Sequence, residues 1–146
     1  MANASLTYWD FAENDRTFFR KVYDNGIKGS VLASLGRDIC ERYLKHIVSE
    51  YDGAYTGAEQ NIRENALRNN CLLLLVKYIH EYMQMDIPQE LECAVEQIEK
   101  FDNWTRYPHI GSRLPSEEDI AKANAAVELT RRFVLEACGK KKEGKG

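Results

Sequence analysis

The stretch WTRYPHIGSRLPSEED, at 104–119, holds the densest set of side chains that could bind an anion. Arg106 and Arg113 carry planar cationic groups that suit phosphate oxygens, and His109 can gain or lose a proton near neutral pH. Tyr107 follows Arg106 directly and offers a flat ring on which a planar group could stack. These residue types would suit a phosphate-bearing ligand. The alternative is that the tyrosine packs a connecting loop against the end of the fold.

A second group of charged residues lies in DICERYLKHI, at 38–47. Asp38, Glu41, Arg42 and Lys45 are three or four residues apart, which places them on one face of a helix. Arg42 and Lys45 are therefore two further candidate donors to a phosphate group. The alternative for this face is a solvated surface on which the four charges pair with one another.

Several kinds of chemistry find no support in the sequence. There is no G-x-S-x-G, no phosphate-cradling glycine loop, and no kinase or dinucleotide fingerprint. The three histidines are scattered and never form an H-x-x-x-H pair, and the four cysteines lie far apart. We therefore expect no metal site and no cofactor. We expect the cysteines to be small buried hydrophobic residues in a reducing compartment.

The composition predicts one globular domain at 1–139 followed by a basic flexible tail at 140–146. The chain has 146 residues, of which 44% are hydrophobic and 29% charged. Its formal charge is −3, and the tail KKKEGKG contains four lysines and one glutamate, so the rest of the chain is acidic. Binding of nucleic acid would need a local basic patch. No apolar run is long enough for a membrane span and no secretory signal is visible, so we expect a cytoplasmic protein without a membrane partner.

Apolar residues recur at helical spacing throughout the chain, and no segment alternates as a strand does. The clearest stripe contains Leu32, Leu35, Ile39, Tyr43 and Ile47, with Gly36 beside it to allow close helix contact. Ser116 and Asp119 have the spacing of a capping box that starts the last helix. The predicted fold is all-α, an up-and-down bundle of four long helices plus one shorter helix. The expected helices cover about 5–23, 30–50, 61–83, 91–104 and 117–137.

The order of these segments resembles the HEPN domain (higher eukaryotes and prokaryotes nucleotide-binding). The resemblance covers about 6–137 and rests on WDFAENDRTFF in the first helix, DICERYLK in the second, a long third helix, RYP, and a capped last helix. In this family the second helix typically shows a Gln, a Glu and two lysines. Glu41 and Lys45 match that pattern, Arg42 replaces a lysine, and Asp38 stands where Gln is common. The family's Arg-Tyr-Pro corresponds to Arg106, Tyr107 and Pro108.

Many HEPN proteins are ribonucleases or toxins, in which an arginine is followed after four to six residues by a histidine. Here Arg42 and His46 have three residues between them, and Arg106 and His109 have two. The resemblance therefore implies the non-catalytic branch: a homodimeric domain that binds a nucleotide or forms a complex with a minimal nucleotidyltransferase. The candidate ligand contacts are Arg42, Lys45, Arg106, Tyr107, His109 and Arg113.

Two other functions stay open from the sequence. One is a divergent, metal-independent ribonuclease, of the kind found in toxin–antitoxin pairs. In it His109 or His46 would act as acid or base on RNA, and an arginine would stabilise the phosphate. The other is a purely structural module in which the helices dock a partner chain.

Overall fold

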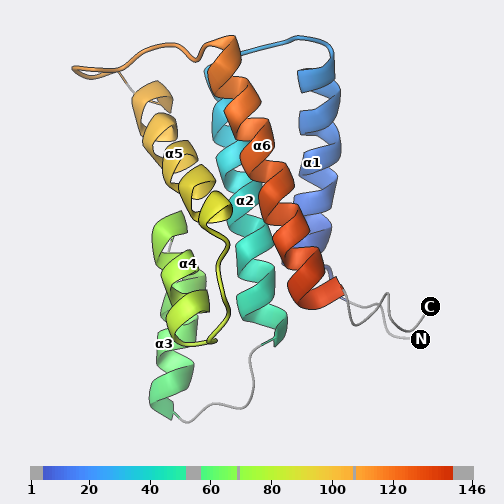
Figure 1. The fold of residues 1–146 in the computed structure, drawn as a ribbon, viewed down its shortest axis with the longest axis vertical. Coiled ribbons are helices and arrows are strands. Elements are labelled where there is room, and N and C mark those ends of the chain that lie inside the picture. The colour runs from blue at the N-terminus through green and yellow to red at the C-terminus, as the bar shows by residue number, and fades with distance from the viewer. Residues whose placement is uncertain (1–4, 52–56, 69, 107, 140–146) are drawn as a thin grey trace.

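The computed structural model describes residues 5–51, 57–68, 70–106 and 108–139. Within these ranges the chain is helical and contains no strand (Figure 1). The prediction of an all-α protein is confirmed, although six α-helices replace the five expected. They are α1 (Tyr8–Asp24), α2 (Ser30–Tyr51), α3 (Gly57–Arg68), α4 (Leu72–Glu81), α5 (Gln89–Arg106) and α6 (Glu117–Val134), and a π-helical turn, η1 (Leu135–Gly139), continues α6.

Helix α2 is the element around which the others pack. It contacts each of the other five α-helices, and in Figure 1 it runs behind α6, between α1 and α5. Ile39, Tyr43 and Ile47 of the predicted apolar stripe have no exposed surface, and neither does Leu44 beside them. The stripe identified from the sequence is therefore the centre of the core.

Gly36 allows the closest approach between α2 and its neighbours. A Cβ atom at this position would lie 3.1 Å from Cε2 of Phe19, 3.4 Å from Cβ of Ala123 and 3.6 Å from Cδ1 of Ile98. These three residues come from α1, α6 and α5, so helices on three sides meet at one point of α2. The predicted role of Gly36 in close helix contact is confirmed.

The helix predicted at 61–83 is wrong, because two helices, α3 and α4, occupy that range. Cys71 has an extended backbone with φ −94° and ψ 118°, and α4 begins after it. The amide N–H of Leu72 donates to Oε2 of Glu99 on α5 over 2.6 Å. The first amides of a helix lack partners within the helix, and here a carboxylate from another element provides one. This contact between distant residues could not be read from local periodicity.

Capping boxes begin both α1 and α6. The one predicted for Ser116 and Asp119 is confirmed: Ser116 accepts from the amide of Asp119 at 3.1 Å, and Asp119 accepts from the amide of Ser116 at 2.9 Å. Thr7 and Asp10 form the same arrangement at the start of α1. Because Thr7 is the cap, α1 begins at Tyr8 rather than near residue 5.

Two ion pairs join α1 to α6 on one side of α1. Arg16 binds both carboxylate oxygens of Glu128, at 2.7 and 2.8 Å, and Arg131 binds both oxygens of Glu13, at 2.8 and 3.1 Å. The hydroxyl of Tyr43 also donates to Glu13. Burial raises the pKa of Tyr43. Burial alone would raise the pKa of Glu13 too, but its hydrogen bonds from Arg131 and Tyr43 outweigh that effect and lower it.

The cysteines follow the prediction only in part. Cys40 and Cys138 are buried, whereas Cys71 is half-buried and Cys93 is exposed. Cys93 lies on the outer side of α5, because Leu91, Val95 and Ile98 form the inner side. Burial raises the pKa of the Cys40 thiol to about 12, so that thiol stays protonated at neutral pH.

None of the described helices is long and apolar enough to cross a membrane.

The packing around Gly36 predicts a large cost for a bulkier side chain. We expect Gly36→Val to lower the free energy of unfolding by about 2 kcal/mol, because its side chain would have to displace Phe19 and Ala123. Urea unfolding measures the change. Gly29→Val is the control, since a Cβ atom there meets nothing within 4 Å. Equal stability of the two variants would contradict this description of the core.

Candidate functional site

A cavity of about 280 Å³ opens between α5, α6 and the loop that connects them. Its volume lies just below the range of about 300–1,000 Å³ that is typical of small-ligand pockets. Ile98 and Ala123 form its apolar part. The polar lining comes from three elements: Gln97 and Lys100 on α5, Arg113 on the loop, and Asp119 and Lys122 on α6.

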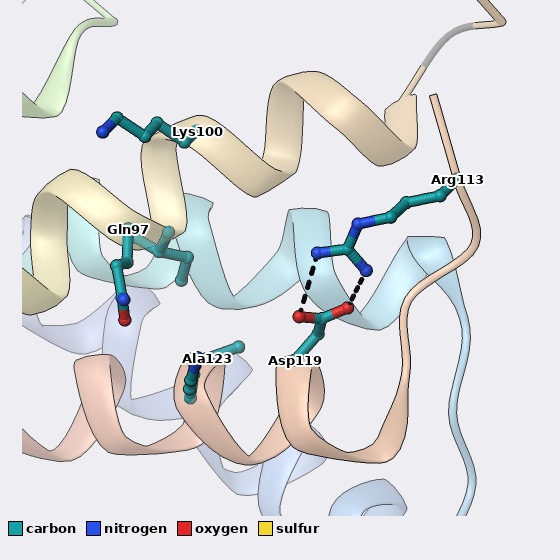
Figure 2. A pocket seen from close by; sticks show the side chains of 7 residues that line it. Gln97, Lys100, Arg113, Asp119 and Ala123 are labelled. Carbon is teal, nitrogen blue, oxygen red and sulfur yellow. Dashed lines mark hydrogen bonds and ion pairs between the residues drawn. The ribbon is translucent and has the colours of Figure 1, made fainter. Parts of the chain in front are cut away.

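Of the predicted site residues whose side chains the structure describes, Arg113 lines this cavity. Figure 2 shows its side chain reaching from the loop to the first turn of α6, where it meets both oxygens of Asp119. Nη2 of Arg113 lies 3.1 Å from Oδ1 of Asp119. The hydrogen bond from Arg113 lowers the pKa of Asp119 to about 2, and the amide of Ser116 acts in the same direction. Asp119 therefore stays ionised at neutral pH and fixes the guanidinium at the cavity.

The cavity lining carries a surplus of positive charge. Lys100, Arg113 and Lys122 are cationic, and Asp119 is the only carboxylate among the described lining residues. Nζ of Lys122 pairs with Glu118 at 3.2 Å, outside the lining, where both side chains are well exposed. In Figure 2 Gln97 points toward α6, whereas Lys100 lies along α5 with its amino group turned away from Arg113. Both lysines are solvent-exposed and flexible, so they can turn toward an anion without breaking a buried contact.

Arg42 and Lys45, the cations predicted on α2, lie outside the cavity and are paired with acidic residues. The Arg42 guanidinium donates to Asp15 of α1. Lys45 is buried, with 6% of its surface exposed, and its ammonium group donates to Glu41 at 2.9 Å and to Asn70 at 3.4 Å. Only the pair of Lys45 with Glu41 lies within the predicted charged face, and it is buried rather than solvated, whereas Arg42 pairs with a residue of α1. A ligand would have to break a buried contact to reach Lys45.

The contacts of Lys45 belong to a larger buried network. Arg37, only 6% exposed, donates from Nε to Glu99 over 3.0 Å and from Nη1 to Glu41. Burial alone would lower the pKa of Arg37, but the hydrogen bonds to Glu41 and Glu99 outweigh that effect and raise it. Because Glu99 also holds the amide of Leu72, this network ties α2, α4 and α5 together. Arg37 and Lys45 are therefore buried cations, and both bind Glu41.

His109 lies on the exposed loop between α5 and α6. Its backbone amide donates to the Ser112 hydroxyl at 3.1 Å, and its Nδ1 lies 2.7 Å from the carbonyl oxygen of Ile110. These are turn contacts, and His109 does not line the cavity. Arg106 ends α5, but its side chain lies outside the described part of the structure, as does the whole of Tyr107. Their predicted roles stay predictions.

Lys100, Lys122 and Gln97 are cavity residues that sequence reasoning missed. Each lies on a helix face that reads as ordinary solvated surface. Two of them lie on α5 and one on α6, and only the packing of these two helices brings them to one cavity. The single sequence signal was Arg113, which stands six residues before Asp119 at the start of a capped helix.

Comparison of the chain with protein-family models, with curated proteins and with solved structures found no match.

The low pKa of Asp119 predicts how its pair with Arg113 depends on pH. The folded pKa of about 2 lies below the ordinary 3.8, so the pair contributes its full stability above about pH 4 and loses it as pH falls toward 2. At pH 7 we expect Asp119→Asn to lower the free energy of unfolding by about 1 kcal/mol, a value reduced for the exposure of Arg113 to water. Urea unfolding of both proteins between pH 7 and pH 2 measures the difference. A difference that stays constant down to pH 2 would contradict this assignment.

Proposed function

We propose that the chain is a HEPN-like helical bundle that is not itself catalytic and that binds the phosphate group of a nucleotide in the cavity between α5 and α6. The order of the motifs over about 6–137 supports the family, and the absence of the Arg/His spacing supports the non-catalytic branch. A nucleotidyltransferase partner and a homodimer are part of the same proposal, because members of this family form both.

The positive lining of the cavity is the observation that carries the ligand proposal. Outside its tail the chain is acidic, yet Lys100, Arg113 and Lys122 surround one small cavity. Arg113 offers two N–H groups in a plane, the geometry in which guanidinium binds phosphate. Asp119 holds it in place now, and a phosphate dianion could share or take over that guanidinium.

The apolar part of the cavity and its neighbouring loop suit the rest of a nucleotide. Ile98 and Ala123 offer a nonpolar surface beside the cations, and Gln97 offers an amide that can both donate and accept hydrogen bonds. Arg106 and Tyr107 precede Arg113 in the sequence by seven and six residues, and we retain them with His109 as candidate contacts. The proposal assigns Arg42 and Lys45 to the fold instead, because neither lines the cavity and Lys45 is buried.

Isothermal titration with ATP, GTP, AMP and a short RNA, each at two salt concentrations, tests the proposal. We expect a nucleotide to bind more weakly at high salt, because charge pairs are screened there. Arg113→Ala should weaken binding about tenfold or more, the usual effect of losing a hydrogen bond between charged groups. The double variant Lys100→Ala/Lys122→Ala should also weaken it, without touching the capping box of α6.

Lys77→Ala is the matched control, since Lys77 is an exposed lysine on α4 outside the cavity lining. It should bind the nucleotide as the unaltered protein does. If none of the four ligands gives a binding heat, nucleotide binding is contradicted. If the cavity variants bind with the same affinity as the control, this cavity is not the site. RNA cleavage that is lost in His109→Ala or His46→Ala would contradict the non-catalytic assignment.

A further inference from the structure

The cavity between α5 and α6 is closed at its floor. Ile98 and Ala123 form its apolar part, and both meet Gly36 of α2, where a Cβ atom would lie 3.6 Å from Cδ1 of Ile98 and 3.4 Å from Cβ of Ala123. Ile98 is 2% exposed and Ala123 has no exposed surface, so the floor belongs to the packed core. A nucleotide chain cannot pass through a packed core. A ligand must therefore enter and leave on the side that faces solvent.

Arg113 lies at one end of this cavity, between the loop and α6. Figure 2 shows the loop chain passing Arg113 and running into the first turn of α6, while α5 lies across the cavity. A terminal phosphate reaches this end with one covalent link to the rest of its ligand. An internal phosphodiester has a link on each side, and both links would have to leave through the same opening. The position of Arg113 therefore favours a terminal phosphate.

Asp119 competes with any ligand for the Arg113 guanidinium. Nη2 of Arg113 lies 3.1 Å from Oδ1 of Asp119, and Asp119 is kept in place because it also accepts from the amide of Ser116 at 2.9 Å. A carboxylate that is covalently part of the site acts at a high effective concentration. A phosphodiester brings one negative charge, as the carboxylate does, so no charge is gained when it replaces Asp119. A phosphate monoester brings almost two at neutral pH.

The charges around the cavity suit this second negative charge. Lys100, Arg113 and Lys122 carry three positive charges in the described lining, and Asp119 carries one negative charge. Glu118 lies outside the lining and pairs with Lys122 at 3.2 Å, which leaves a surplus of one positive charge. The two side chains of that pair are 50% and 76% exposed, so the pair is weak and Lys122 can exchange it for a phosphate. The surplus is then two. Other carboxylates of the adjoining turns lie outside the lining, namely Glu96 and Glu117.

We propose that the cavity selects the terminal phosphate of a nucleotide over the internal phosphodiesters of RNA, and that Asp119 is the residue that makes this selection. The inference rests on the proposed function, since it names which phosphate the nucleotide-binding cavity accepts. Arg113 attracts both kinds of phosphate, whereas the tethered carboxylate of Asp119 gives way only to a group that brings more negative charge.

Titration with two ligands that differ by one methyl group tests the selection. AMP carries a terminal phosphate, and the phosphate methyl ester of AMP carries a diester with the same base and sugar. At pH 7 we expect AMP to bind about tenfold more tightly or better, the usual effect of a hydrogen bond between charged groups. Asp119→Asn should bind the methyl ester more tightly than the unaltered protein does, and so reduce this ratio. The control Lys77→Ala should leave the ratio unchanged.

The charge of the phosphate provides a second readout. A phosphate monoester loses its second proton with a pKa of about 6, so lowering the pH from 7 to 5 turns AMP into a monoanion. We expect the affinity of AMP to fall toward that of the methyl ester, whose phosphate keeps one charge. The Arg113–Asp119 pair is intact at both pH values, because the pKa of Asp119 is about 2. The methyl ester also controls for protons taken up by the protein, for example by His109.

The outcomes separate this inference from the proposed function. If neither ligand binds, the proposed function fails and the inference fails with it. If both bind with equal affinity, or if the ratio is the same in Asp119→Asn, the cavity binds phosphate without selection and the inference alone is overturned. A short RNA that binds as tightly without a terminal phosphate as with one also overturns it.

Discussion

The buried guanidinium of Arg37 is the interaction on which the arrangement of the helices depends. It joins α2 to α5 through Glu99, and Glu99 in turn holds the first amide of α4. A charge this deeply buried is tolerated only when hydrogen-bonded carboxylates surround it, so its position fixes those of its partners. Glu99 stands between Ile98 and Lys100 in α5, so this contact lies beside two residues that line the cavity between α5 and α6.

The described charges of the molecule divide into those that hold the fold and those that remain available. On α2, Arg37, Arg42 and Lys45 are all paired, and their contacts reach α1, α5 and Asn70, two residues before α4. Around the cavity, the two lysines are exposed and only Arg113 has a fixed carboxylate partner in the lining. The pairs around the cavity lie nearer to solvent than the pair of Lys45 with Glu41 on α2.

Sequence patterns predicted what depends on local spacing. The apolar stripe of α2, the close contact at Gly36 and the capping box of α6 follow from residues a few positions apart, and all are present. The patterns failed where the structure depends on contacts between residues that are distant in the sequence. The start of α4 depends on Glu99, and the cavity depends on the meeting of α5 with α6. The exposure of Cys93 depends on which side of α5 turns inward, because cysteine suits either side.

The most direct measurement is the map of backbone amide NMR shifts as ATP is added to the isotopically labelled protein. If the phosphate site is the cavity between α5 and α6, the largest shifts will fall at 97–100, at Arg113 and at 119–123, with only small changes on α2. Largest shifts around Arg42 and Lys45 would show that ligands compete for the charges that hold the fold. That result, or a spectrum that does not change, would contradict the assignment of the cavity.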